Sequence, residues 1–314
     1  MPRKKITVVG SFAVGMTIRT PNIPVFGMTM FGSDFNMGPG GKGSNQAVAL
    51  ARLGMDAALA GIIGRDKLAD IALDLYAREG VNATLIRQSD VLQTGVGFII
   101  LNKTGENFII LDMGANTLVD AAFVDTLEPR IAQSDVVMTV LEIPVAAAVR
   151  AMELGKRHGA ITILNPAPAA PIPESVFPYV DYLTPNESEL RILLGLRPDD
   201  PRPSDELVDM LRARGVRNVI VTLGRKGVLV VTDKMKTIVP AAPVEVIDTT
   251  GAGDSFNAGF ATALAEGRDL IEAVRFGIVC GGLVCTQLGV IPGLPSRDMA
   301  DALFSTLAFN EKGR

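Results

Sequence analysis

The sequence predicts an α/β fold in which a mainly parallel central sheet carries helices on both faces. From about residue 120 onward, short apolar segments alternate with helical patterns. Such alternation is typical of parallel strands that are joined by crossover helices. The length of 314 residues and the apolar fraction of 48% permit a large buried core. We therefore expect residues 1–314 to form one domain.

The elements of the first part follow from β-branched runs and from glycine stops. The segment 6–10 has the composition of a buried first strand. Gly54 and Gly80 each follow a helical pattern, and glycine commonly ends a helix. These signals predict a helix at 43–53, a strand at 57–63 and a helix at 67–79.

The remaining chain continues the alternation of strands and helices. The expected elements are helix 120–132, strand 135–141, helix 145–157, strand 160–164, strand 180–183, helix 187–194, helix 204–213, strand 217–222, a β region at 227–247, and a helical tail at 252–308 that a loop at 288–296 interrupts.

Two segments suggest a separate small sheet. Residues 19–37 are rich in Pro, Gly, Phe and Met and contain short alternating pieces such as 28–31, which favours strands and turns over helix. Residues 94–111 contain two apolar runs joined by a hairpin-like connector at 102–106. We expect segments from about 12–37 and 94–111 to form a β-sheet lid over the main domain.

Composition and charge limit the possible partners. The net charge is −4 and the longest basic stretch is residues 3–5, which argues against nucleic acid. No apolar run approaches the roughly 20 residues that cross a bilayer, so we expect no membrane segment. Cys280 and Cys285 fit no zinc spacing and are expected to be free thiols in a reducing cytoplasm. His158, the only histidine, is expected to have a structural role at a helix end.

The segment 244–256 carries the strongest functional signal. It predicts a strand, a tight turn and the start of a helix. The first N–H groups of a helix have no partner within it and attract anions, and glycine allows the backbone to approach them closely. Asp254 adds a carboxylate in the first turn, an arrangement that suits phosphoryl transfer to a hydroxyl. The alternative is a turn needed only for packing, with Asp254 complementing the helix dipole.

The segment 37–47 is a second glycine-rich cluster. It contains G-x-G-x-x-G but no evident acidic ribose partner follows, and Gly43 stands where a Walker A loop requires Ser or Thr. What remains is a glycine-rich approach to a helix. Lys42 and Asn45 lie on it and can donate hydrogen bonds to sugar hydroxyls. The alternative is a mobile surface loop.

Taken together, the two clusters resemble the two signatures of the ribokinase-like (PfkB) carbohydrate kinase family, most closely its ribokinase branch. The resemblance extends over nearly the whole chain. The supporting motifs, in the family's order and spacing, are Gly40-Gly41-Lys42-Gly43-Ser44-Asn45, Leu141-Glu142-Ile143-Pro144, Asn165-Pro166-Ala167-Pro168, Thr184-Pro185-Asn186-Glu187-Ser188-Glu189, Thr222-Leu223-Gly224-Arg225-Lys226-Gly227 and Asp248-Thr249-Thr250-Gly251-Ala252-Gly253-Asp254.

This resemblance implies a role for each matching residue. Asp254 would be the general base that takes a proton from the attacking hydroxyl. The anion hole for the transferring group would be formed by Thr250, Gly251, Ala252 and Gly253. The sugar would be contacted by Gly41, Lys42, Asn45 and Glu142.

The resemblance also implies cofactors and an assembly. ATP would be bound by Asn186, Thr222, Gly224, Thr250 and Gly253. Glu189 would organise Mg²⁺ and the phosphates through water, and the loop 284–293 would lie over adenine. A monovalent-cation site of the potassium type would be formed by Asp248, Thr250, Val284, Gln287, Gly289 and Gly293. The lid would also form the interface of a homodimer.

One departure concerns the sugar. Ribokinases carry Asn-x-Asp just after the first strand, where Ala13 and Gly15 stand here, so the sugar half of the site is altered. We predict an ATP- and Mg²⁺-dependent kinase for a primary hydroxyl of a pentose or related sugar, such as a deoxy sugar or a bulkier furanose. One alternative is a nucleoside kinase whose base lies beside Phe12 and Ala13. The other is a catalytically idle sugar-binding or regulatory protein.

Overall fold

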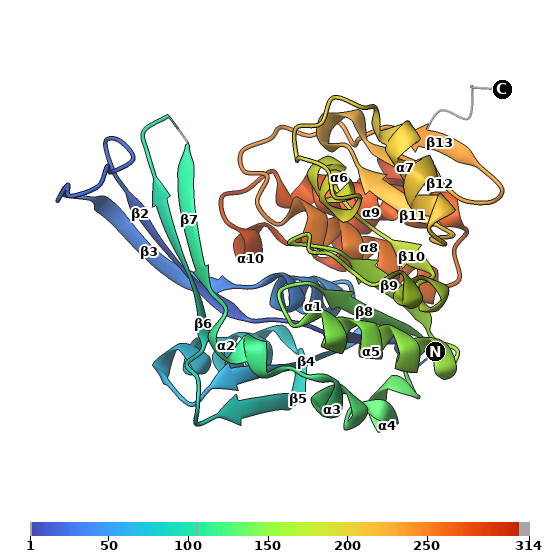
Figure 1. Cartoon of the computed structure of the whole chain (residues 1–314), viewed down its shortest axis with the longest axis horizontal. Coiled ribbons are helices and arrows are strands. Elements are labelled where there is room, and N and C mark those ends of the chain that lie inside the picture. Colours follow the sequence, from blue (N-terminus) through green and yellow to red (C-terminus); the bar gives the residue numbers. More distant parts are fainter. Residues whose placement is uncertain (1, 105, 308–314) are drawn as a thin grey trace.

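The computed structural model describes residues 2–104 and 106–307, and its larger sheet has nine strands in the order β13-β12-β11-β10-β9-β8-β1-β4-β5 (Figure 1). Neighbouring strands from β11 through β5 run parallel, and β12 and β13 are added antiparallel at one edge. The predicted mainly parallel sheet is confirmed. Its strands are β1 Lys5–Val9, β4 Asp56–Gly64, β5 Asn82–Ser89, β8 Val136–Val140, β9 Ile161–Asn165, β10 Tyr182–Leu183, β11 Val219–Thr222, β12 Val228–Val231 and β13 Lys236–Val239.

Helices cover both faces of this sheet because its strands are apolar on both sides. In β1, Ile6 and Val8 belong to one buried cluster and Val9 to the other. The first cluster receives side chains from α1, α2, α8 and α9, and the second from α3, α5, α6 and α7. The helices are α1 Lys42–Arg52, α2 Lys67–Glu79, α3 Ala121–Asp125, α4 Glu128–Ile131, α5 Val145–Arg157, α6 Glu187–Leu193, α7 Ser204–Ala213, α8 Ala252–Ala265, α9 Leu270–Val284, α10 Val290–Gly293 and α11 Arg297–Thr306.

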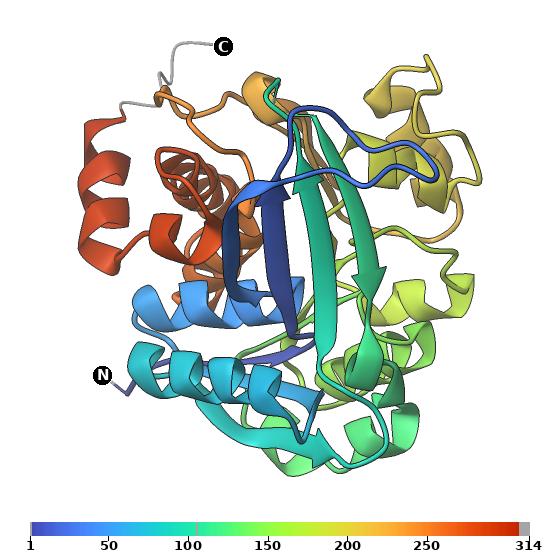
Figure 2. The ribbon, with the colours of Figure 1, turned by 90° about the vertical axis from the view of Figure 1, so that its left-hand side faces the viewer.

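A second sheet projects from the main body, as the views in Figures 1 and 2 show. Its order is β3-β2-β6-β7, formed by β2 Ala13–Arg19, β3 Ser33–Gly40, β6 Gly95–Leu101 and β7 Asn107–Asp112. The expected small sheet from these two segments is therefore present. However, the alternating piece at 28–31 forms no strand, because β2 begins earlier, at Ala13, and pairs with β3 from Ser33 onward. Residue 105 of the predicted connector lies outside the described residues.

The predicted β region at 227–247 is wrong in its last part. Strand β13 ends at Val239, and residues 240–250 form no strand. The side chain of Val244 lies against Gly282 of helix α9, and the N–H of Ile247 donates to the carbonyl of Cys285 at 2.8 Å. The segment therefore does not extend the sheet: Val244 lies against α9 and the Ile247 backbone bonds to the end of that helix, while Ile247 itself is 62% exposed.

Two predicted helical segments are divided in the structure. The segment 120–132 forms α3 and α4 with a break at Thr126 and Leu127. The tail breaks between α8 and α9, where Gly267 has a φ of 81° and the Asp269 side chain accepts from Glu272 N to cap α9. The predicted loop at 288–296 contains α10, and residue 308 lies outside the described residues.

No helix in residues 2–104 and 106–307 is long and apolar enough to cross a membrane.

Candidate active site

Asp254 lies in the first turn of helix α8, directly after the turn at Gly251, where φ is 80°. Only 4% of the residue is exposed. Its Oδ2 accepts a hydrogen bond from Asn45 Nδ2 at 2.8 Å, and its Oδ1 accepts from Gln46 Nε2 at 3.4 Å. Burial raises the pKa of Asp254, and the positive charge of Lys42 and the two amide donors oppose this shift only in part.

The glycine-rich approach to helix α1 is packed against the backbone that follows strand β1. A Cβ added at Gly43 would lie 2.4 Å from Ser11 N, and Ser44 N donates to Ser11 O at 2.9 Å. Only glycine permits this close approach. The alternative of a mobile surface loop is therefore wrong, and the packing holds Lys42 and Asn45 at the end of α1 that faces Asp254.

Glu142 connects this helix end to the segment after strand β8. One of its oxygens, Oε2, accepts from Ser11 Oγ at 2.5 Å and from Lys42 N at 2.7 Å. Burial raises the pKa of Glu142. Burial also acts to lower the pKa of Lys42, but the charges of Asp254, Glu142 and Glu189 outweigh it and raise that pKa overall. The Lys42 ammonium therefore stays charged in the presence of three carboxylates.

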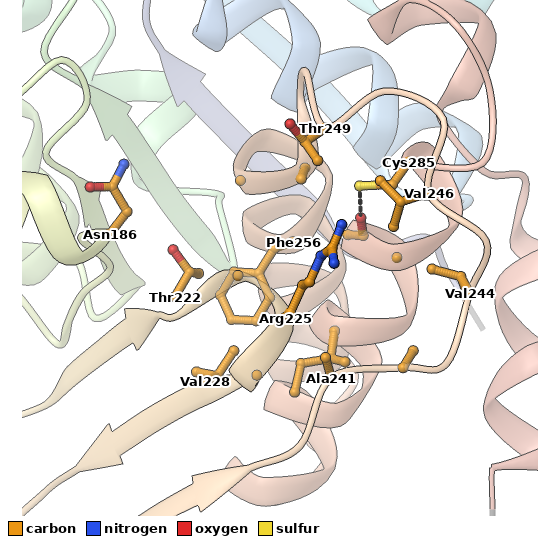
Figure 3. Close-up of a pocket in the computed structure, with 18 of the residues that line it drawn as sticks. Asn186, Thr222, Arg225, Val228, Ala241, Val244, Val246, Thr249, Phe256 and Cys285 are labelled. Atoms are coloured by element: carbon orange, nitrogen blue, oxygen red, sulfur yellow. Dashed lines mark hydrogen bonds between the residues drawn. The ribbon is translucent and has the colours of Figure 1, made fainter.

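On the other side of Asp254 lies a cavity of about 770 Å³. Five of the residues expected at the ATP site or anion hole line it: Asn186, Thr222, Gly224, Ala252 and Gly253. Asn186 caps helix α6 in a reciprocal pair with Glu189, and an isolated β-bridge joins it to Thr222. In Figure 3, Asn186 and Thr222 face Val244, Val246 and Cys285 across the cavity.

Much of the cavity lining was missed by the sequence analysis. Val228, residues 241–244, Val246 and Phe256 contribute to it, and so does Arg225, but the sequence analysis assigned no ligand contact to any of them. Within the loop 284–293, which was expected over adenine, Cys285 is the one residue that lines the cavity. Burial raises the pKa of the Cys285 thiol, so the cavity is lined here by an uncharged thiol.

Asp248 joins the turn before α8 to the loop before α10. Its Oδ1 accepts from Thr250 N at 2.9 Å and from Thr250 Oγ1 at 2.6 Å, while its Oδ2 accepts from Gly289 N at 3.0 Å. Although burial acts to raise the pKa of Asp248, these bonds lower it below the ordinary aspartate value. Gly293 lies against Val284, since a Cβ at Gly293 would be 2.6 Å from the Val284 carbonyl oxygen.

Three of the residues expected at the potassium-type site, Asp248, Thr250 and Gly289, are joined by these hydrogen bonds. Within residues 2–104 and 106–307, no three His, Cys, Asp or Glu side chains are arranged to hold a metal ion. Glu189 interacts electrostatically with Lys42 and Asp254, and burial raises its pKa. A Mg²⁺ ion that keeps its waters and is bound mainly by phosphates fits this arrangement.

The family model described as pfkB family carbohydrate kinase matches residues 3–297. This chain belongs to that family. The ribokinase of Haemophilus influenzae is 37% identical over 295 residues, which cover 94% of this chain and 96% of that protein. A deoxyribokinase of Salmonella typhimurium is 32% identical over 294 residues, which cover 93% and 95%. The predicted membership of the ribokinase-like carbohydrate kinases is confirmed.

Solved structures of this carbohydrate kinase family share the whole fold. The ribokinase of Thermotoga maritima has a TM-score of 0.87 and 35% identity, with coverage of 96% of this chain and 99% of that chain. The ribokinase of Arabidopsis thaliana, complexed with ribose and ATP, has a TM-score of 0.90 and 28% identity, with the same coverage. These likenesses confirm the predicted ribokinase-like fold.

Proposed function

We propose that this carbohydrate kinase transfers the γ-phosphoryl group of ATP to a primary hydroxyl of a pentose or related sugar. The observation that carries the proposal is the position of Asp254. Its buried carboxylate contacts Asn45 on one side, and the adjacent residue, Gly253, lines the 770 Å³ cavity on the other. A base at this junction can reach a hydroxyl while the phosphoryl group approaches from the cavity.

On the sugar side, Asp254 would accept the proton of the attacking hydroxyl. Its raised pKa makes it a stronger base than an exposed aspartate, which suits general-base catalysis near neutral pH. Asn45 Oδ1 is buried without a hydrogen-bond partner among the described residues, and a sugar hydroxyl would satisfy it. Gly41, Lys42 and Glu142 would complete the contacts to the sugar.

On the nucleotide side, the N-terminus of the 14-residue helix α8 would stabilise the transferring phosphoryl group. The anion hole would comprise the turn Thr250, Gly251, Ala252 and Gly253. The cavity volume is in the range of small-ligand sites, and we assign it to ATP, with Asn186, Thr222 and Gly224 among its contacts.

Two cations belong to the proposal. Mg²⁺ would neutralise charge on the phosphates, and Glu189 would order it through water. A potassium-type site would use the Asp248 region together with carbonyl groups of the loop 284–293. Turnover measured in K⁺ and in Na⁺ at equal ionic strength tests this site: K⁺ should give the higher rate, and equal rates would remove the site from the proposal.

The acceptor sugar is set by the start of strand β2. Ala13 and Gly15 offer no side-chain polar group there, and Ala13 lies against Gly41, where an added Cβ would be 2.8 Å from Ala13 N. A sugar hydroxyl that ribokinases bind at this point would lose its partners here. We therefore propose a deoxy pentose or a bulkier furanose in preference to ribose itself.

The second sheet is proposed to act as a lid and as a homodimer interface. Phe98 on β6 and Phe108, Ile109, Ile110 and Leu111 on β7 are each about half exposed. A large exposed apolar patch often marks an interaction site. Light scattering should give twice the chain mass for the wild type and the single-chain mass for Ile109→Glu.

The two free, buried cysteines fit the expected cytoplasmic location.

The deciding experiment measures ADP release over a panel of pentoses, deoxypentoses, hexoses and nucleosides, with the phosphorylated product identified by ³¹P NMR. We expect ADP release that depends on a sugar and yields a sugar phosphate ester. Turnover of nucleosides alone would favour the nucleoside kinase. Sugar binding with no ADP release would favour the idle binding protein.

A further inference from the structure

A chain of buried hydrogen bonds leads away from the Asp254 carboxylate. Gln46 Nε2 donates both to Asp254 Oδ1 at 3.4 Å and to Asn165 Oδ1 at 3.1 Å. Asn165 Nδ2 in turn donates to the backbone carbonyl of Thr184 at 3.0 Å. Gln46, Asn165 and Thr184 are at most 5% exposed. These bonds connect helix α1 with the ends of strands β9 and β10.

The chain of bonds returns to the same helix turn from which it starts. Thr184 Oγ1 donates to Asn257 Oδ1 at 2.7 Å, and Asn257 Nδ2 donates to the carbonyl of Gly253 at 2.8 Å. Gly253 is covalently joined to Asp254, so the bonds form a closed ring. We call this set of side chains the polar ring: Gln46, Asn165, Thr184, Asn257 and Asp254.

The direction of each bond is fixed by the groups that take part. Amide nitrogens can only donate. Both oxygens of Asp254 must therefore accept, Oδ1 from the Gln46 amide and Oδ2 from the Asn45 amide. A carboxylate with both oxygens accepting is favoured in its ionised form, which is the form that acts as a base. The ring therefore opposes the effect of burial at Asp254.

The other half of the ring fixes a peptide plane. Because the Gly253 carbonyl can only accept, Asn257 must present its nitrogen to it, and Asn257 Oδ1 then accepts from the Thr184 hydroxyl. The peptide between Gly253 and Asp254 is planar, so holding that carbonyl also sets the direction of the Asp254 N–H. This N–H is one of the first of helix α8, where the anion would be stabilised.

We propose that the polar ring is a positioning device which sets the orientation of the base and of the anion-binding turn together. The proposal rests on the assignment of Asp254 as the base. Gln46, Asn165, Thr184 and Asn257 act through Asp254 and Gly253 and are positioning residues. A merely structural ring would satisfy buried polar groups and affect only stability.

Kinetics of two single variants and their double variant test the coupling. Gln46→Met removes the donor to Asp254, and Thr184→Val removes the donor to Asn257 while its backbone carbonyl remains. We expect each to lower kcat about tenfold, and the double variant to lower it about 10–30-fold, because side chains in one network are not additive. Thr184→Ser, which keeps the hydroxyl, should restore most of the wild-type kcat.

Thr162→Val is the matched control. Thr162 is equally buried and lies in strand β9, at the end opposite Asn165, where its hydroxyl donates to Tyr179 O at 2.6 Å outside the ring. It should lose stability like Thr184→Val but keep its kcat. A hundredfold loss of kcat in the double variant would overturn the proposal. So would a loss of kcat in Thr162→Val as large as that in Thr184→Val.

A titration of the Asp254 carboxyl by ¹³C NMR in ligand-free protein gives a readout that needs no activity. The signal is assigned from its absence in Asp254→Asn. Gln46→Met should raise the midpoint by about half a pH unit or more, because a donor to the charged form is lost. An unchanged midpoint would overturn the ring's effect on the base. If the wild type transfers no phosphate, the proposed function fails, and this titration still decides whether the ring acts on Asp254.

Discussion

Gly251 gives the sharpest quantitative prediction. It has a φ of 80°, and a Cβ added there would lie 2.5 Å from Cγ1 of Val290. In Gly251→Ala the left-handed backbone costs about 1–2 kcal/mol. The contact with Val290 adds about 1–3 kcal/mol, the usual cost of overpacking. We therefore expect the free energy of unfolding to fall by roughly 2–5 kcal/mol.

Two further variants separate the backbone cost from the steric cost. Gly159 has a φ of 77°, and a Cβ added there would meet no atom within 4 Å. Gly159→Ala should therefore cost only the backbone part, about 1–2 kcal/mol. The double variant Gly251→Ala/Val290→Ala removes the methyl groups that clash and should be less destabilised than the sum of its two single variants.

Urea unfolding followed by circular dichroism measures these stabilities, and steady-state kinetics measure kcat. Gly251→Ala should lower kcat by about tenfold or more, because a displaced donor in an anion hole commonly costs 100-fold or more. Gly159→Ala should leave kcat unchanged. Equal losses of stability in Gly251→Ala and Gly159→Ala would refute the steric argument, and a wild-type kcat in Gly251→Ala would refute the anion hole.

Two other predictions concern ionised groups. Burial raises the pKa of Asp254 in the folded protein above its value in the unfolded chain. The protonated carboxyl therefore stabilises the fold below the unfolded-state pKa, and this stabilisation is lost as the pH rises through the folded-state pKa. Asp254→Asn should thus have a higher Tm than the wild type at pH 7, with the gap closing in acid; a lower Tm at pH 7 would contradict this. Arg52 donates to Glu79 at 2.8 Å and to the carbonyls of Ile291 and Leu294, and its hydrogen bond lowers the pKa of Glu79. Arg52→Ala should lower the free energy of unfolding in urea by about 2–4 kcal/mol at pH 7, less than the loss for a fully buried pair. This difference from the wild type should shrink below about pH 4.5, as Glu79 becomes protonated. A difference in stability that does not depend on pH would argue against the ion pair.

The central sheet could be predicted from sequence because its strands are buried on both faces. All five residues of β8 are buried, and such continuous apolar runs between helical segments are typical of parallel sheets. Helix ends with local signals were also found, such as Gly80, which follows α2 in the left-handed conformation. The break at Gly267 and Asp269 carried a signal of the same kind, a glycine stop followed by a capping acid, which the sequence analysis missed.

The segment 244–247 shows where local pattern fails. Its β-branched residues are typical of a strand, but Val244 lies against helix α9, Val244 and Val246 line the cavity, and Ile247 is 62% exposed. A β-branched pattern therefore reports neither that a side chain is covered nor what covers it. Only the tertiary structure distinguishes a strand edge from an irregular segment that lies against a helix.

The candidate site was predictable where a motif holds the chemistry and hidden where contacts are distant in sequence. Lys42, Asn45 and Asp254 stand in recognisable glycine-rich motifs. Gln46 reaches Asp254 across 208 positions, and Ser11 reaches Glu142 across 131. Gln46, Asn165 and Thr184 lie in or head segments that the sequence analysis singled out, but no local pattern shows that they contact one another, so the bonds that orient the base emerged only from the folded arrangement.

The proposed reaction requires Asp254 to take the proton from the attacking sugar hydroxyl. Single-turnover formation of sugar phosphate, measured with wild type and Asp254→Asn at saturating ATP and sugar, tests it most directly. We expect the rate constant to be about 100-fold or more lower in Asp254→Asn, because a positioned general base contributes a factor of about 10²–10⁴ to the rate. The sugar affinity should be retained within a few-fold. A wild-type rate constant in Asp254→Asn, with sugar still bound, would contradict this role of Asp254.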